Sequence, residues 1–236
     1  MTFRFRKYSM LLALAAACSL AHSAPRSEIR LGMVTTLTTN AGAGGQATKE
    51  GIDLAIEKLG GKVGGIPARV FYEDDALQPE LGKQKTEKLI LENKVDFLIG
   101  YNYSNVLLAS LKPAVDNKTF LLAITGPSQI AGDQCSPYFF SARDQNGQAP
   151  QALGKVLNKH NVKSLYVLAP NYAAGKDMID GVMSTFKGKV VGQDLTKWPT
   201  QLDFAAEIAK IRAAKPDAVF VFFPPAQAVQ FTTQYA

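Results

Sequence analysis

The sequence predicts an α/β fold made of two lobes with parallel sheets. Short apolar runs alternate with segments of helical periodicity, a pattern typical of parallel sheets covered by helices. Two of the runs, 164–169 and 218–223, are apolar almost without a break, as expected of strands buried on both faces. A polar stretch at 138–146 interrupts the alternation, which then starts again. We therefore expect a lobe boundary there, with lobes at 24–142 and 143–236.

The elements follow in chain order. In the first half, strands are expected at 29–35, 68–72, 95–100 and 119–125, with a short ambiguous segment at 138–141. Helices are expected between them at 46–59, 79–93 and 104–116. Pro79 suits a first helical turn, where its missing N–H costs nothing. The second half predicts helices at 147–159, 173–186 and 202–214, strands at 163–169, 189–195 and 217–223, and the start of one more helix.

The first 23 residues have the features of a cleaved secretory signal. Three basic residues precede an apolar stretch at 10–20, and small residues at 21 and 23 allow cleavage before Ala24. The apolar stretch is shorter than the roughly 20 residues that span a bilayer. We expect export to the periplasm. The alternative is a lipid anchor at Cys18, but the large aliphatic residue usual three positions before a lipidated cysteine is missing.

Charge and composition exclude several classes of function. Without Arg4, Arg6 and Lys7 the formal net charge falls from +6 to +3, and no basic run suggests nucleic acid. Cys135 is then a single cysteine, expected to be a buried free thiol rather than a reactive one. One histidine, His160, remains, so a multi-histidine metal site is impossible.

The sequence also lacks the motifs of a cofactor-dependent or hydrolytic enzyme. It has no Gly-x-Ser-x-Gly elbow. The Gly-rich segment at 42–47 does not directly follow a strand, as a dinucleotide fingerprint must, and is better explained as the lip of a cleft. We expect no catalysis, no cofactor and no metal.

Four loops are candidates for a ligand site, because ligands of parallel sheets bind beyond the carboxyl ends of the strands. These loops are rich in Thr, Asn, Ser, Gly and Tyr, and they span residues 36–46, 101–104, 125–130 and 170–175. Small residues expose backbone N–H groups, and helix N-termini attract anions. A carboxylate is therefore the expected ligand group.

Particular residues of these loops have competing explanations. Tyr103 and Ser104 open a helix, where Ser104 either binds a ligand or caps the helix. Gly126 and Ser128 either bind the ligand or form a plain turn. Tyr172 either offers an aromatic face and a hydroxyl to an organic ligand or packs against the next loop. Three more aromatic residues are weaker candidates for the same lining: Tyr101, Phe222 and Phe223, of which the two phenylalanines are more often part of a sheet core. The acidic triplet 73–75 is expected to form a solvated turn or to brace the neighbouring loop by hydrogen bonds, rather than to serve acid–base chemistry or bind a cation.

Eight stretches, taken together in order and spacing, resemble the type I periplasmic solute-binding proteins of ABC transporters, in the branch that includes leucine/isoleucine/valine-binding proteins. The stretches are 29–32, 49–55, 64–66, 73–75, 95–100, 135–140, 169–177 and 215–219. The resemblance covers essentially all of 28–236. It implies a monomer that captures a small solute between its lobes and delivers it to a membrane permease. The alternative is the ligand domain of a sensory receptor of the same fold.

The resemblance also implies roles for the candidate residues. Ser104 falls where the family binds the ligand carboxylate, Gly126 and Ser128 on the second loop of the first lobe, and Tyr172 on the tyrosine that closes over the ligand. Pro224 replaces a frequent aromatic, and the Pro-Asn-Tyr loop is similar to members that take aromatic or other organic acids. By this likeness the second lobe is incomplete at Ala236, so we expect weak binding and an exposed apolar surface.

Overall fold

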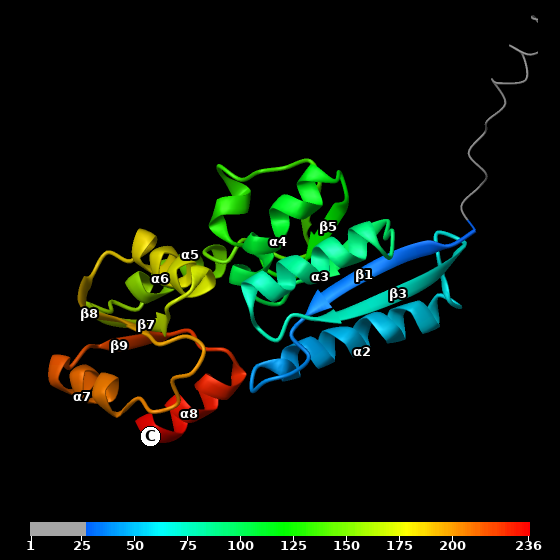
Figure 1. Cartoon of the computed structure of the whole chain (residues 1–236). Coiled ribbons are helices and arrows are strands. Elements are labelled where there is room, and N and C mark those ends of the chain that lie inside the picture. Colours follow the sequence, from blue (N-terminus) through cyan, green and yellow to red (C-terminus); the bar gives the residue numbers. More distant parts are fainter. Residues whose placement is uncertain (1–26) are drawn as a thin grey trace, which may run out of the picture.

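The protein forms two α/β lobes, each with a predominantly or wholly parallel sheet (Figure 1). The computed structural model describes residues 27–236, so the expected signal at 1–23 and Cys18 lie outside the described part. The first sheet has six strands in the order β2-β3-β1-β4-β5-β6, parallel except for the β2–β3 hairpin. The second has three parallel strands in the order β8-β7-β9. The α/β prediction with two parallel sheets is confirmed.

The first lobe alternates strands and helices up to Ser141. Its strands are β1 (Ile29–Thr35), β2 (Lys62–Val63), β3 (Ile66–Asp74), β4 (Phe97–Gly100), β5 (Phe120–Ala123) and β6 (Phe139–Ser141). Its helices are α2 (Gly42–Lys58), α3 (Pro79–Leu91), α4 (Ser104–Asp116) and the 3₁₀ helix η2 (Ser128–Ala131). Helices α3 and α4 bury one face of the sheet, where Leu89 of α3 and Leu107 of α4 pack in one cluster with Leu121 of β5.

The second lobe follows the same alternation. Its strands are β7 (Ser164–Pro170), β8 (Lys189–Thr196) and β9 (Ala218–Val221). Its helices are α5 (Gln148–Lys159), α6 (Ala173–Thr185), α7 (Ala205–Ala214) and α8 (Pro225–Tyr235). One face of the sheet packs on α6 through Ile179 and Val182, and the other packs on α7 and α8 through Ile208 and Phe231.

One apolar cluster crosses the boundary between the lobes. It contains the core of the first lobe together with Tyr172 and Ala174 from the start of α6, and Trp198 and Phe222 pack against it. Helices α4 and α6 come together at this boundary. We call this region the junction. The carboxyl ends of β4 and β7 both lead into it, which places the expected ligand loops of the two lobes next to each other.

Part of the first sheet has an apolar face that the described residues leave open. Helix α2 covers β1 through Ile52 and Ile56. Farther along the sheet, Phe120 pairs in register with Phe97, and Leu122 pairs with Phe140. These four side chains are 40 to 53% exposed. The expected uncovered apolar surface is thus present on β4 to β6. Cys135 is also exposed, so the expectation that it is buried is wrong.

Candidate functional site

The starts of α4 and α6 meet at the junction without side-chain caps. Tyr103 is the N-cap residue of α4 and Tyr172 that of α6, both in extended conformation and neither helix with a capping hydrogen bond from a side chain. Ser104 is the first residue of α4. The alternative that Ser104 is an ordinary helix cap is therefore wrong. The first N–H groups of a helix and its dipole favour an anion at this end.

Ser104 belongs to a fully buried polar network. Its Oγ lies 2.8 Å from Thr125 Oγ1. Asn146, between the two lobes, donates from Nδ2 to Ser104 Oγ at 3.2 Å and to Asp177 Oδ2 at 3.0 Å. Gly126 donates its N–H to Asn146 Oδ1 at 3.4 Å. The network thus connects two loops of the first lobe with helix α6 of the second.

Asp177 carries a buried carboxylate that Ser128 binds from the opposite lobe. Ser128 donates its N–H to Asp177 Oδ2 at 3.0 Å and its hydroxyl to Oδ1 at 2.5 Å. Asp177 is 7% exposed. A hydroxyl, a backbone N–H and a side-chain amide therefore already hold one carboxylate at the junction, using the donor types that carboxylates prefer. Ser128 and Gly126 are brought into the network beside Ser104; their role toward a ligand stays a prediction.

An aromatic cluster forms the other part of the junction. The Tyr172 and Trp198 rings are stacked, with centroids 4.4 Å apart and 12° between planes. Trp198 also contacts Tyr103 of the first lobe at 5.6 Å, and Tyr172 contacts Phe222 at 6.5 Å. We call these four residues the aromatic cluster. Stacked rings of this kind suit the flat face of an aromatic ligand.

The two tyrosine hydroxyls of the cluster stay protonated. Burial, and after it the neighbouring Tyr103, raises the pKa of Tyr172. Burial and the charge of Asp75 raise the pKa of Tyr103, whose hydroxyl donates to Ala41 O at 3.1 Å. Both groups are therefore neutral hydrogen-bond donors rather than negative charges, which is compatible with an anion nearby.

The weaker aromatic candidates divide between junction and core. Phe222 joins the junction by its contact with Tyr172. Tyr101 does not: it is fully buried in the first lobe, with its hydroxyl 2.8 Å from Thr86 Oγ1. Phe223 packs with Phe204 and Phe231 in the core of the second lobe.

Two residues of the acidic triplet, Asp74 and Asp75, brace the loop that follows β1, whereas Glu73 forms ion pairs with Lys85 and Lys88 of α3. Asp74 Oδ1 accepts from the Leu37 N–H at 2.9 Å, and its Oδ2 accepts from the Thr38 hydroxyl at 2.6 Å. Asp75 Oδ1 accepts from Thr36 Oγ1 at 2.5 Å. The expected bracing role is thus present. The Gly-rich segment at 42–47 is not a loop but the first turns of α2.

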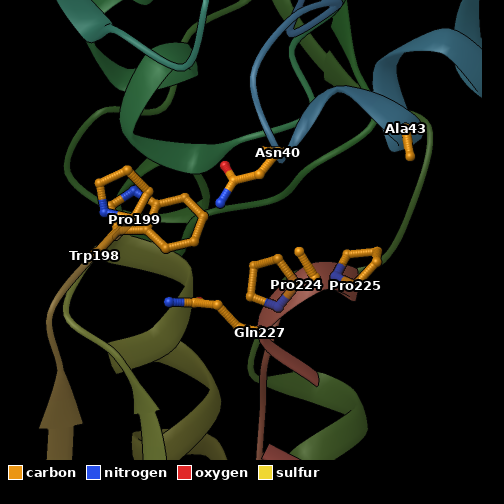
Figure 2. A pocket seen from close by; sticks show the side chains of 9 residues that line it. Asn40, Ala43, Trp198, Pro199, Pro224, Pro225 and Gln227 are labelled. Atoms are coloured by element: carbon orange, nitrogen blue, oxygen red, sulfur yellow. The ribbon is translucent and has the colours of Figure 1, made fainter. Parts of the chain in front are cut away.

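A narrow pocket opens beside the cluster, between the two lobes (Figure 2). Its walls come from the residues around the start of α2, from the loop after β8 and from the start of α8. The lining residues are Asn40, Ala41, Ala43, Trp198, Pro199, Pro224, Pro225, Ala226 and Gln227. Trp198 thus belongs both to the aromatic cluster and to this pocket.

The sequence-based choice missed Trp198, Asn146 and Asp177. A signal for Trp198 was available, because the loop at 197–204 follows strand β8 and ends at the same edge as the loops chosen. Asp177 lies within a helix, where a charged residue is expected on a wet face, so nothing in its local pattern pointed to burial. Within residues 27–236, no helix is long and apolar enough to cross a membrane, and no cluster of His, Cys, Asp or Glu is suited to a metal ion.

Fold and junction together define a two-lobed α/β binding protein. The model of the periplasmic binding protein family matches residues 28–236, and the chain belongs to this family. It is similar to a solved solute-binding protein of an ABC transporter from R. palustris in complex with benzoate, with a TM-score of 0.84 and 30% identity over 88% of this chain and 59% of that one.

Two further relatives differ in what their names say they bind. The solute-binding protein from Rhodopseudomonas palustris BisB5, solved with 3,4-dihydroxybenzoic acid, has a TM-score of 0.82 and 27% identity over 89% of this chain and 59% of that one. The Leu/Ile/Val-binding protein BraC3 of Rhizobium johnstonii is 26% identical over 89% of this chain and 57% of its own length. The chain thus spans less than two thirds of these relatives.

Proposed function

We propose that this protein is the periplasmic substrate-binding component of an ABC transporter and captures a small aromatic carboxylate at the junction. The observation that carries the proposal is the meeting of the uncapped N-termini of α4 and α6, with the Ser104 hydroxyl, beside the aromatic cluster. The helix ends and Ser104 would receive the carboxylate, while Trp198 and Tyr172 would contact the ring.

The aromatic cluster favours an aromatic acid as the ligand, because aromatic rings pack well face to face or edge to face with other rings. Tyr172 is stacked on Trp198, and Tyr103 lies against the same tryptophan. The 30%-identical relative that was solved with benzoate supports the same choice.

The remaining parts of the proposal follow from membership of the family. The chain would reach the periplasm through its signal at 1–23, act as a monomer, divide into lobes at 24–142 and 143–236, and deliver its solute to a membrane permease without catalysis. The division at residue 142 is supported by the sheets, because β6 ends the first sheet at Ser141 and α5 already packs on α6.

The test compares binding of benzoate and leucine to the purified chain by ligand-observed NMR, which detects weak complexes. We expect benzoate to bind and Ser104→Ala to weaken it about tenfold, the loss of roughly one hydrogen bond to a charged group. Ser110→Ala is the matched control, because Ser110 is buried on the same helix and its Oγ has no hydrogen-bond partner. Binding of leucine but not benzoate, or of neither, would contradict the proposal.

A further inference from the structure

The pocket beside the aromatic cluster has no charged side chain in its wall. Two of its lining residues, Asn40 and Gln227, carry amide side chains, and the others are apolar: alanine, proline and Trp198 (Figure 2). The volume open to the centre of a water molecule is about 20 Å³. That space is enough for one water-sized group. The pocket therefore suits a small neutral substituent rather than an ion.

Gln227, one of the lining residues, has an amide side chain that is held in one orientation. It lies in the first turn of α8 and is 2% exposed. Its Nε2 donates to the Gln201 carbonyl at 3.1 Å. Because a carbonyl oxygen only accepts, this bond fixes the orientation of the amide. The other amide atom, Oε1, is then an acceptor, and it is buried without a hydrogen-bond partner.

A buried acceptor without a partner is unfavourable, and a bound donor would relieve that cost. Gln227 shares its pocket with Trp198, whose ring reaches Tyr172 and Tyr103 next to Ser104. An aromatic ligand anchored near Ser104 and lying along Trp198 would therefore extend its far end toward Gln227.

We infer that Gln227 determines specificity by accepting a hydrogen bond from a hydroxyl on the ring of the ligand, at the end opposite its carboxylate. This inference rests on the proposed function and narrows its ligand to hydroxylated aromatic acids. A hydroxyl fits the neutral wall, and an ammonium group would lie there without a counter-charge.

The test measures the affinities of benzoate, 4-hydroxybenzoate and 4-methoxybenzoate for the wild-type chain by NMR titration. We expect 4-hydroxybenzoate to bind about tenfold more tightly than the other two, the difference that one satisfied buried acceptor makes. The methoxy compound fills the same space without an O–H donor, so it separates hydrogen bonding from size. Equal affinities for the hydroxy and methoxy compounds would overturn the inference.

Gln227→Met is the matching change in the protein, since it keeps the length of the side chain and removes the acceptor. We expect this variant to lose the preference for 4-hydroxybenzoate over 4-methoxybenzoate. Gln230→Met, an exposed position on the same helix, is the control and should keep the preference. A preference that survives in Gln227→Met would refute the role of Gln227, while binding of benzoate would still support the proposed function. Failure of all three acids to bind would overturn both.

Discussion

Asp74 and Asp75 are adjacent carboxylates with opposite pKa shifts. Burial pushes the pKa of Asp74 upward, but hydrogen bonds from Thr38, Leu37 and Ala76 outweigh it and lower the pKa. For Asp75, burial dominates over the hydrogen bonds from Thr36 and Leu77 and raises the pKa. Asp74 therefore stabilises the fold as an anion, whereas the charge of Asp75 costs stability.

The two shifts predict opposite pH dependences for Asp74→Asn and Asp75→Asn. The stability that Asp74 contributes is present above the usual pKa of 3.8 and is lost as pH falls through its lowered value. Asp74→Asn should therefore cost about 1 kcal/mol at neutral pH and less in acid. Ionisation of Asp75 lowers the stability of the wild-type protein as pH rises from 3.8 through the raised pKa of this residue. The stability of Asp75→Asn relative to wild type should therefore increase over that pH range. Melting temperatures measured from pH 3 to pH 7 check this, and parallel trends for the two variants would contradict it.

Trp198 is the single tryptophan of the chain, so its fluorescence reports on the junction alone. We expect benzoate to change its emission, because a bound ring would alter the stack with Tyr172. The change should saturate as benzoate is added. In Ser104→Ala, the benzoate concentration at half saturation should be about tenfold higher, because the affinity is lower. Saturable binding seen by NMR with no change in emission would show that the ligand lies elsewhere.

At the residue scale, the sequence predicted part of the junction. Tyr103, Ser104 and Tyr172 were chosen because they follow strand ends, and the fold brings them together. Asp177 and Asn146 could not be found in this way, because their partners lie 20 or more residues away and the burial of a polar side chain depends on those partners. Tyr101, a weaker candidate, is instead fully buried in the first lobe, where its hydroxyl meets Thr86 of α3.

At the scale of elements, two glycines let helices pack close to the ends of strands. A Cβ on Gly45, in the first turn of α2, would lie 1.8 Å from Thr36 O, and one on Gly175, in the first turn of α6, would lie 1.9 Å from Pro170 O. No side chain can move aside to relieve these overlaps, because both partners are backbone atoms. Each lobe therefore uses a glycine to hold a helix start against the end of a strand.

Gly45→Ala and Gly51→Ala should have opposite effects although both change α2. The new methyl group at residue 45 meets backbone, so we expect a loss of at least about 3 kcal/mol. A Cβ at Gly51 meets nothing within 4 Å, so alanine there should stabilise the helix by about 0.5 to 1 kcal/mol. Urea unfolding of both variants measures the difference, and a small effect at residue 45 would refute the packing argument.

The long elements were predicted well and the short ones were not. Helix α4 occupies 104–116 as expected, and β1 occupies 29–35. The two-residue strand β2 and the short 3₁₀ helix η2 were missed, because elements this short cannot show a periodic pattern of apolar residues. Helix α2 begins at Gly42 rather than near residue 46, since glycines that normally indicate a loop are needed there for close packing.

At the scale of the whole molecule, Asp177 connects the lobes. Replacing it with alanine removes both bonds from Ser128 and the one from Asn146. We expect a loss of about 3 kcal/mol and a larger radius of gyration by small-angle X-ray scattering, because buried donors left without an acceptor will draw in water. Asp180→Ala, an exposed position on α6, is the control and should leave both quantities unchanged. An unchanged radius for Asp177→Ala would contradict the connecting role.

The uncapped starts of α4 and α6 have a consequence for the conditions under which the junction can attract an anion. No Lys or Arg is buried among residues 27–236, but the guanidinium of the exposed Arg143 acts on Tyr172, so the positive potential at the junction comes from peptide dipoles, hydroxyl groups and this guanidinium. Peptide dipoles do not gain or lose protons, and guanidinium groups remain charged in proteins. Capture of an anion should therefore persist from mildly acidic to alkaline surroundings, and only the ionisation of the solute itself, or unfolding, should end it.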